Sequence, residues 1–445
     1  MTGDPASDLR GLVALLALLL WPGLVVVRSP GPVVPFLSLS FWLLSWWWVP
    51  SGRERSSFLG AALLFFLLLS LLRLLKPLPV SRPEGRTLGV FVLALSCLLP
   101  LLWLPVAPGL SLASAEARLV AWREGLPATY GPLLPVSGFG AHAPGLPLLA
   151  ADVALLSGVA PHRTVLLVAL AACGLVVLAV FTLLARAGRP GFGLALAAAL
   201  ALATLLGAHG GFALPGPATL AAALGLVALG LLVRGSGRSP AVAAGALLGA
   251  AVTVHALAVL PIATAAAVVG SRRRRLLALA IGLVLSEPRL GLTLRATSPA
   301  EIRLAPSSEL HELLPRREAV PDAGALLAMA WVRDHADPLA RVCVSPGTAG
   351  RWLPAVAGRS VVPPEVPWVY RDEVRPGATS CRFAILFGPF APAESPLDPA
   401  RPPFAPAPWR TVFDAGSARV LAPASAEDPV TSFDTREGNP SAPRP

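Results

Sequence analysis

Long apolar runs constrain the fold of this chain more than any other feature. Runs of roughly 17–25 apolar residues are long enough to cross the hydrocarbon core of a bilayer as helices. Such runs lie at residues 11–27, 33–50, 57–75, 87–107, 163–185, 191–208 and 216–233, with a longer one at 241–270. Only 14% of the residues are charged, whereas soluble domains carry about 25%. The sequence therefore predicts an α-helical polytopic membrane protein with about nine to ten membrane helices.

The positive charge of the chain lies mainly in the short segments between these runs. Lys and Arg number 36 against 25 Asp and Glu, which gives a formal net charge of +11. The basic clusters are Arg73/Lys76/Arg82/Arg86, Arg186/Arg189, Arg234/Arg238 and Arg272 to Arg275. Placing all four in the cytoplasm gives one consistent topology, because cytoplasmic loops of membrane proteins are rich in Lys and Arg. Since these residues orient helices in the bilayer, they argue against a nucleic-acid partner.

This topology has consequences for three other segments. The run at 241–270 begins and ends on the cytoplasmic side, so we predict two short helices that meet near "TVHALAVLP". The loop 108–162 and the turn 207–217 lie on the outer face. The arginines of "RER" at 53–55 also lie there, which is the one exception to the positive-inside rule in this arrangement.

The last apolar run, at 276–286, is short for a membrane span. It could cross only if the bilayer thins locally or if its helix continues through Glu287 and Pro288, and we expect it to cross. The residues that follow then lie outside. Cys343 and Cys381 belong to this part of the chain, and they could pair only if it faces an oxidising compartment.

Residues 322–423 predict a small soluble α/β domain. Asp322 is placed to cap a helix over 322–336, whose apolar residues recur at helical spacing. Short β-rich runs follow at 341–345, 359–364 and 381–388, and then a hairpin with the turn "DAGS" at 409–423. The predicted organisation is N-terminal membrane helices at 1–107, an outer-face loop with an amphipathic helix and a short membrane helix at 108–162, a membrane core at 163–290, the α/β domain at 322–423 and a disordered tail at 424–445.

The outer loop holds the charged residues most suited to chemistry. Glu116 and Arg123 are seven positions apart on one expected helix and share a face, whereas Arg118 lies off that face. A carboxylate near the membrane surface can act as general base on an acceptor hydroxyl. Arginines suit a lipid-linked phosphate, because their planar fork binds it through two hydrogen bonds. The alternative is a helix that lies on the lipid headgroups with its charges simply solvated.

Three histidines and one aspartate stand at or near breaks in the apolar pattern. His142 precedes a Pro-Gly break and can donate to a phosphate or cap its own loop. Asp152 lies within an apolar helix, where a carboxylate usually faces a cavity or a partner. His209 is followed by two glycines, and His255 precedes Pro261 at the expected apex. The spacing of these histidines is not that of a metal site, so none is predicted, although a role for a divalent cation stays open.

The order of these features resembles that of the bacterial and archaeal GT-C-like membrane glycosyltransferases, which relate to protein O-mannosyltransferases, arabinosyl- and aminoarabinose transferases and oligosaccharyltransferases. The resemblance covers about residues 110–290 and 322–390. It is carried by "LPATYGPLLP", "HAPGLPLLAADVALLSGVAPHRTVLL", "HGGFALPGPATLAAALGL" and "AGALLGAAVTVHALAVLP", and in the tail by "MAWVRDHADP" and "GRWLPAVAGR".

The resemblance implies a GT-C-like core in a bacterial cytoplasmic (inner) membrane, which takes a sugar from a polyprenyl-phosphate carrier and transfers it to an envelope acceptor. Glu116 would be the catalytic base. The residues that would bind the substrate are Arg118, Arg123, Tyr130, His142, His209 and His255. No organic cofactor is implied, and the sequence does not indicate an oligomeric state.

The chain departs from the family pattern at the base. The first outer loop of such enzymes usually offers an Asp, whereas "GLSLASAEARLV" at 109–120 has only Glu116. The His that usually follows that Asp is not evident, and the membrane core is short. Two other functions therefore stay open. One is a non-catalytic protein that binds polyprenyl lipid or a partner transferase, and the other is a transporter or lipid flippase, which broken helices favour.

Overall fold

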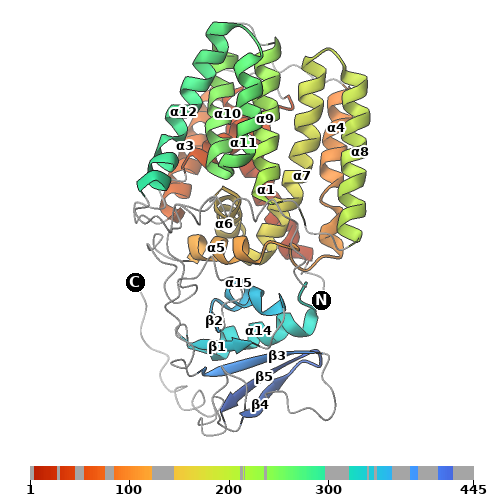
Figure 1. Cartoon of the computed structure of the whole chain (residues 1–445), viewed down its shortest axis with the longest axis vertical. Coiled ribbons are helices and arrows are strands. Elements are labelled where there is room, and N and C mark those ends of the chain that lie inside the picture. Colours follow the sequence, from red (N-terminus) through yellow and green to blue (C-terminus); the bar gives the residue numbers. More distant parts are fainter. Residues whose placement is uncertain are drawn as a thin grey trace. The chain divides into compact units, whose positions relative to one another are not determined.

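The computed structural model describes residues 5–27, 31–45, 55–75, 85–122, 145–210, 214, 216–234, 238–295, 320–337, 340–344, 348–362, 381–388 and 409–423 (Figure 1). The chain divides near residue 320 into two compact units. We call them the helical unit, which precedes this boundary, and the sheet unit, which follows it.

The helical unit consists of helices that coincide with the predicted apolar runs, together with α5 and α6 in the segment predicted as the outer loop. In chain order they are α1 (Pro5–Val26), α2 (Val34–Leu44), α3 (Arg55–Leu75), α4 (Gly85–Ser96), the short 3-10 helix η2 (Leu99–Leu102), α5 (Ser111–Trp122), α6 (Gly145–Ser157), α7 (Pro161–Arg186), α8 (Pro190–His209), α9 (Pro217–Arg234), α10 (Ser239–Val254), α11 (Ala256–Val268) and α12 (Arg272–Arg295). Proline stands in the first turn of α2, α7, α8 and α10, where a missing N–H costs no hydrogen bond.

Within the described residues, five helical segments are long and apolar enough to cross a membrane: α1, Arg55–Leu74, Gly85–Leu102, α7 and α8. Five shorter apolar segments accompany them, in α2, α6, α9, α10 and α11. The length and composition of these helices confirm the prediction of a helical membrane protein. In α7, 83% of the apolar stretch is buried inside the protein, against 33% or less in the other four, so α7 is the central helix of the unit.

The described residues of the basic clusters predicted to be cytoplasmic stand at the ends of α3, α7 and α9 and at or just before the starts of α4, α8, α10 and α12. These helix ends lie at one end of the helical unit (Figure 1). Arg73, at the end of α3, donates hydrogen bonds to Leu24 O and, at 2.8 Å, to Val27 O at the end of α1. Gly230 near the end of α9 packs against the Arg186 side chain at the end of α7. We call this the basic end. Helices α5 and α6 lie at the opposite end, which we call the α5–α6 end (Figure 1).

The apex predicted within 241–270 is confirmed. α10 ends at Val254 and α11 begins at Ala256, so that His255 alone separates two short helices. Its backbone is extended (φ −163°, ψ 99°), although its N–H still donates to Ala251 O at 2.9 Å. α12 runs unbroken from Arg272 to Arg295, as required if the last apolar run is to cross through Glu287 and Pro288.

The sheet unit combines a small mixed sheet with flanking helices. Its elements are α14 (Ala323–His335), β1 (Arg341–Val344), the 3-10 helix η4 (Thr348–Trp352), α15 (Leu353–Ala357), β2 (Ser360–Val362), β3 (Phe383–Phe387), β4 (Trp409–Asp414) and β5 (Ala418–Pro423). The strand order is β2-β1-β3-β5-β4. β1 is parallel to β2 and β3, whereas β5 is antiparallel to β3 and β4.

Local signals predicted the sheet unit well. The Asp322 side chain accepts a hydrogen bond from Ala325 N at 2.8 Å and caps α14 as expected. The hairpin turn falls at "DAGS", where Gly416 takes the left-handed conformation (φ 80°) that favours glycine. Cys343 and Cys381 form a disulfide with a Cα–Cα distance of 5.7 Å, which ties β1 to the start of β3.

Candidate functional site

Four of the seven predicted site residues lie within the described part of the chain: Glu116, Arg118, His209 and His255. The other three, Arg123, Tyr130 and His142, lie outside the described residues. Glu116 and Arg118 belong to α5. His209 ends α8 and His255 follows α10, and both helices start at the basic end.

Glu116 is buried, with only 4% of its surface exposed. Small and apolar residues surround it along α5, among them Ala113, Ala117 and Leu119, which are all buried. Arg118 is only partly exposed. A solvated carboxylate was one of two alternatives from the sequence, and the exposure of Glu116 excludes it. Burial of a carboxylate carries a desolvation cost. Solubility of the protein surface therefore does not explain why a glutamate stands at this position.

The two described histidines have different surroundings. His209 is exposed, and its ring lies edge-to-face against Trp103 at a centroid distance of 6.3 Å. His255 is fully buried at the α10–α11 break. Gly145, the first residue of α6, packs directly against this break, since a Cβ there would lie 2.5 Å from Val254 Cγ2. The start of α6 thus covers an interrupted helix whose backbone groups lipid could not satisfy.

Asp152 of α6 has the partner that its position predicted, and the partner is Arg55. The guanidinium donates from Nε to Oδ1 and from Nη2 to Oδ2, both at 2.7 Å, and both side chains are almost fully buried. Arg55 also donates to Ser45 O, Ser45 Oγ and Trp42 O at the end of α2. Its guanidinium carbon lies 4.6 Å from the centre of the Phe58 ring. These bonds engage all five guanidinium N–H groups, so Arg55 is a structural residue that joins α2, α3 and α6.

The same pair accounts for one of the two arginines that form the exception to the positive-inside rule. Arg55 belongs to the "RER" segment that the topology places outside. Its charge is neutralised by Asp152 inside the protein, so it does not act as a free loop charge. Sequence reasoning missed the pair because 97 positions separate its members. The available signal was Asp152 itself, a carboxylate in an apolar helix that needed a cation.

A second ion pair joins the starts of α1 and α7. Arg163 donates to Asp8 from Nε at 2.6 Å and from Nη2 at 2.5 Å, and only 4% of its surface is exposed. It also donates to Leu101 O at 2.7 Å and to Leu104 O, next to η2. The arginine therefore ties three segments together near the ends of α1 and α7 that lie away from the basic end. Sequence reasoning gave neither partner a role.

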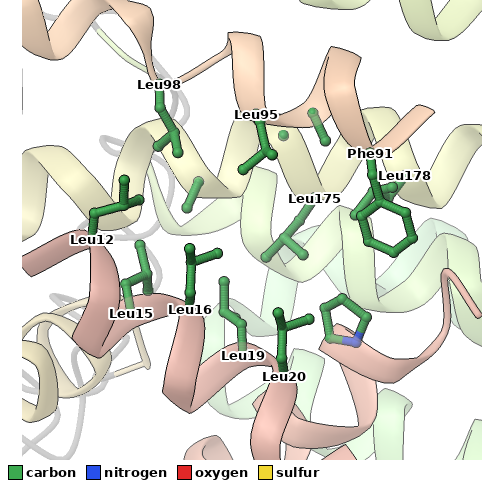
Figure 2. Close-up of a pocket in the computed structure, with 14 residues that line it drawn as sticks. Leu12, Leu15, Leu16, Leu19, Leu20, Phe91, Leu95, Leu98, Leu175 and Leu178 are labelled. Carbon is green, nitrogen blue, oxygen red and sulfur yellow. The ribbon is translucent and has the colours of Figure 1, made fainter. Parts of the chain in front are cut away.

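An apolar pocket of about 220 Å³ lies between α1, α4 and α7 (Figure 2). Leu12, Leu16 and Leu20 line it from α1, Leu95 from α4 and Leu175 from α7, and its walls are almost wholly hydrocarbon. α4 and α7 approach each other closely at Gly174, where a Cβ would lie 2.5 Å from Ala94 O. This close approach forms one side of the pocket.

No group of three His, Cys, Asp or Glu side chains that could hold a metal ion occurs within the described ranges. Comparison of the chain with family models, with curated proteins and with solved structures finds no match. A function for this chain is therefore inferred from the arrangement of its own residues.

Proposed function

We propose that this protein is a GT-C-like membrane transferase, which moves a sugar from a polyprenyl-phosphate carrier to an acceptor at the outer face of a bacterial cytoplasmic membrane. The observation that carries the proposal is the buried Glu116 on α5. A carboxylate shielded from water can accept the proton of an acceptor hydroxyl as that oxygen attacks the sugar. The same attack breaks the bond between the sugar and the phosphate, which leaves as polyprenyl phosphate.

Positive charge suited to the phosphate lies close to this carboxylate in the sequence. Arg118 is two positions from Glu116 and therefore points from a different side of α5. It is partly exposed, so it remains accessible to a ligand. In the proposal Arg118 and Arg123 hold the phosphate, while Tyr130, His142, His209 and His255 contact the sugar, the acceptor or the carrier.

The direction of α12 supports an outer location for the sheet unit. α12 starts at the basic end with Arg272 and spans 24 residues, which corresponds to about 36 Å of helix. The hydrocarbon core is about 30 Å thick, so α12 is long enough to cross it, although it is not one of the five segments that meet the criteria of both length and composition. The disulfide between Cys343 and Cys381 fits this location, because disulfides persist in oxidising compartments.

We therefore expect Cys343 and Cys381 to resist a membrane-impermeant maleimide in intact spheroplasts until a reductant is added. Cys343 is completely buried and Cys381 is only 7% exposed, so labelling relies on the opening of the sheet unit that loss of the disulfide permits. Both should then become labelled without lysis, because the sheet unit lies outside. Cys97 and Cys173 are buried free cysteines of the helical unit and serve as internal controls that stay unlabelled. Labelling of Cys343 and Cys381 only after lysis would place the sheet unit in the cytoplasm and contradict this topology.

The activity is tested with the purified full-length protein in nanodiscs, supplied with a panel of polyprenyl-phosphate sugars and an acceptor extract from the envelope. Release of free polyprenyl phosphate above that from empty nanodiscs is the expected result. Retention of the carrier lipid without release would contradict a transferase and indicate a binding protein. Movement of the intact carrier between the leaflets of sealed proteoliposomes, without release in nanodiscs, would indicate a flippase.

A further inference from the structure

The pocket between α1, α4 and α7 has no role in the proposed chemistry, and the inference drawn from it does not depend on that chemistry. All three helices contribute to segments that are long and apolar enough to span a membrane. Leu95, which lines the pocket, is itself 48% exposed on the outer surface of α4. The pocket therefore opens toward the surroundings of a membrane span, and those surroundings are hydrocarbon.

The dimensions of the pocket limit what can fill it. Its α1 wall runs from Leu12 to Leu20, a rise of eight residues or about 12 Å along the helix (Figure 2). Its volume of about 220 Å³ is many times what a single water needs. A pocket of this length and volume can hold a segment of one extended hydrocarbon chain.

The chemistry of the walls and the supply of lipid around the pocket distinguish its possible occupants. Water is disfavoured, because a buried water needs two to four polar partners and the lining is almost entirely carbon. The bilayer supplies unbranched acyl chains in large excess at the opening beside Leu95.

We propose that this pocket is a binding site for one acyl chain of a bilayer phospholipid. The chain lies along α1, in the space left where Gly174 brings α7 against the backbone of α4 at Ala94. Binding adds hydrocarbon contacts to Leu16, Leu95 and Leu175 that the protein does not supply from its own side chains. The bound lipid thus completes the packing between the N-terminal helix and the central helix.

The test uses the full-length protein in nanodiscs that contain a phospholipid with a photoactivatable diazirine in one acyl chain. Cross-linked residues are identified by mass spectrometry of peptides. We expect cross-links at Leu16 and Leu95 that saturate as the mole fraction of the probe rises. Labelling at Leu206, an exposed residue of α8, should instead rise in proportion to the probe, as for lipid that merely surrounds the protein.

Ala171 lines the pocket from α7, so the variant Ala171→Phe places a phenyl ring in the space that the acyl chain would occupy. Since the loss of even two buried methylene groups weakens binding about tenfold, labelling at Leu16 and Leu95 should fall at least tenfold. Ala198→Phe makes the same change on the exposed face of α8 and should leave this labelling unchanged.

Three results would overturn the proposal. Labelling at Leu16 and Leu95 that never saturates in the wild-type protein would show ordinary surrounding lipid, and this measurement needs no variant to fold. Loss of that labelling when polyprenyl phosphate is added would assign the pocket to an isoprenoid chain. Peptide–peptide cross-links between two copies, in place of lipid adducts, would assign it to an interface.

Discussion

Replacing Glu116 by glutamine is expected to slow the release of polyprenyl phosphate by about 10²–10⁴-fold, the range that general base catalysis contributes. Glutamine keeps the shape and hydrogen-bonding capacity of the side chain, but it cannot accept the proton of the acceptor hydroxyl. Because only 4% of Glu116 is exposed, bulk water is poorly placed to act as base in its stead. The measurement is the single-turnover rate of release in nanodiscs at saturating carrier lipid.

Two controls separate a lost base from a damaged fold. Glu116→Asp retains a carboxylate that is one methylene shorter, so it should recover part of the rate, and more than the glutamine variant. Both variants should bind the carrier lipid and unfold thermally as the wild type does. A glutamine variant that releases polyprenyl phosphate at the wild-type rate would remove Glu116 from the mechanism, even if the protein proves to be a transferase.

Replacing Arg55 by methionine is expected to lower the free energy of unfolding by about 3–5 kcal/mol. The change leaves the Asp152 carboxylate, which is completely buried, without a counter-charge. It also removes the hydrogen bonds to Trp42 O and Ser45 O that hold the end of α2. The measurement is denaturant unfolding of the purified protein in mixed micelles, followed by far-ultraviolet circular dichroism.

A double variant sharpens this prediction. Arg55→Met combined with Asp152→Leu should recover most of the lost stability, because replacing both members of a buried pair by apolar side chains is often neutral. Arg10→Met, which removes an exposed arginine of α1, should change stability by no more than about 0.5 kcal/mol. If the Arg55 variant unfolds like the Arg10 variant, the buried pair does not form in the protein.

Features that depend on local chemistry were predictable from the sequence. The apolar runs gave the helices, because a chain in hydrocarbon must satisfy its backbone groups within each segment. The break at His255 followed from a run too long for one span that begins and ends on the same side. Asp322 at the start of α14 and "DAGS" at the hairpin turn were recognised because caps and turns require particular side chains.

Features that depend on distant segments were not predictable in this way. The position of Asp152 in an apolar helix predicted that it has a partner. It did not indicate that the partner is Arg55, since no local rule links residues 97 positions apart. The pairing of Arg163 with Asp8 spans 155 positions, and no local sequence pattern indicates it. Periodicity also failed to show that Glu116 is buried, because small residues occupy several sides of α5 and so mark no single buried face. The pocket forms only where α1, α4 and α7 pack together, so no single segment of the sequence indicates it.

The separation between Arg55 and Asp152 also imposes an order on synthesis. Ribosomes add about 5–20 residues per second, so the 97 positions between them take about 5–20 s to translate. During that interval the start of α3 is made but α6 is not, and Arg55 has no carboxylate to meet. A lone arginine at the end of a membrane helix keeps its head among the lipid headgroups. The start of α3 therefore remains at the membrane surface and reaches its buried position only after α6 has been synthesised.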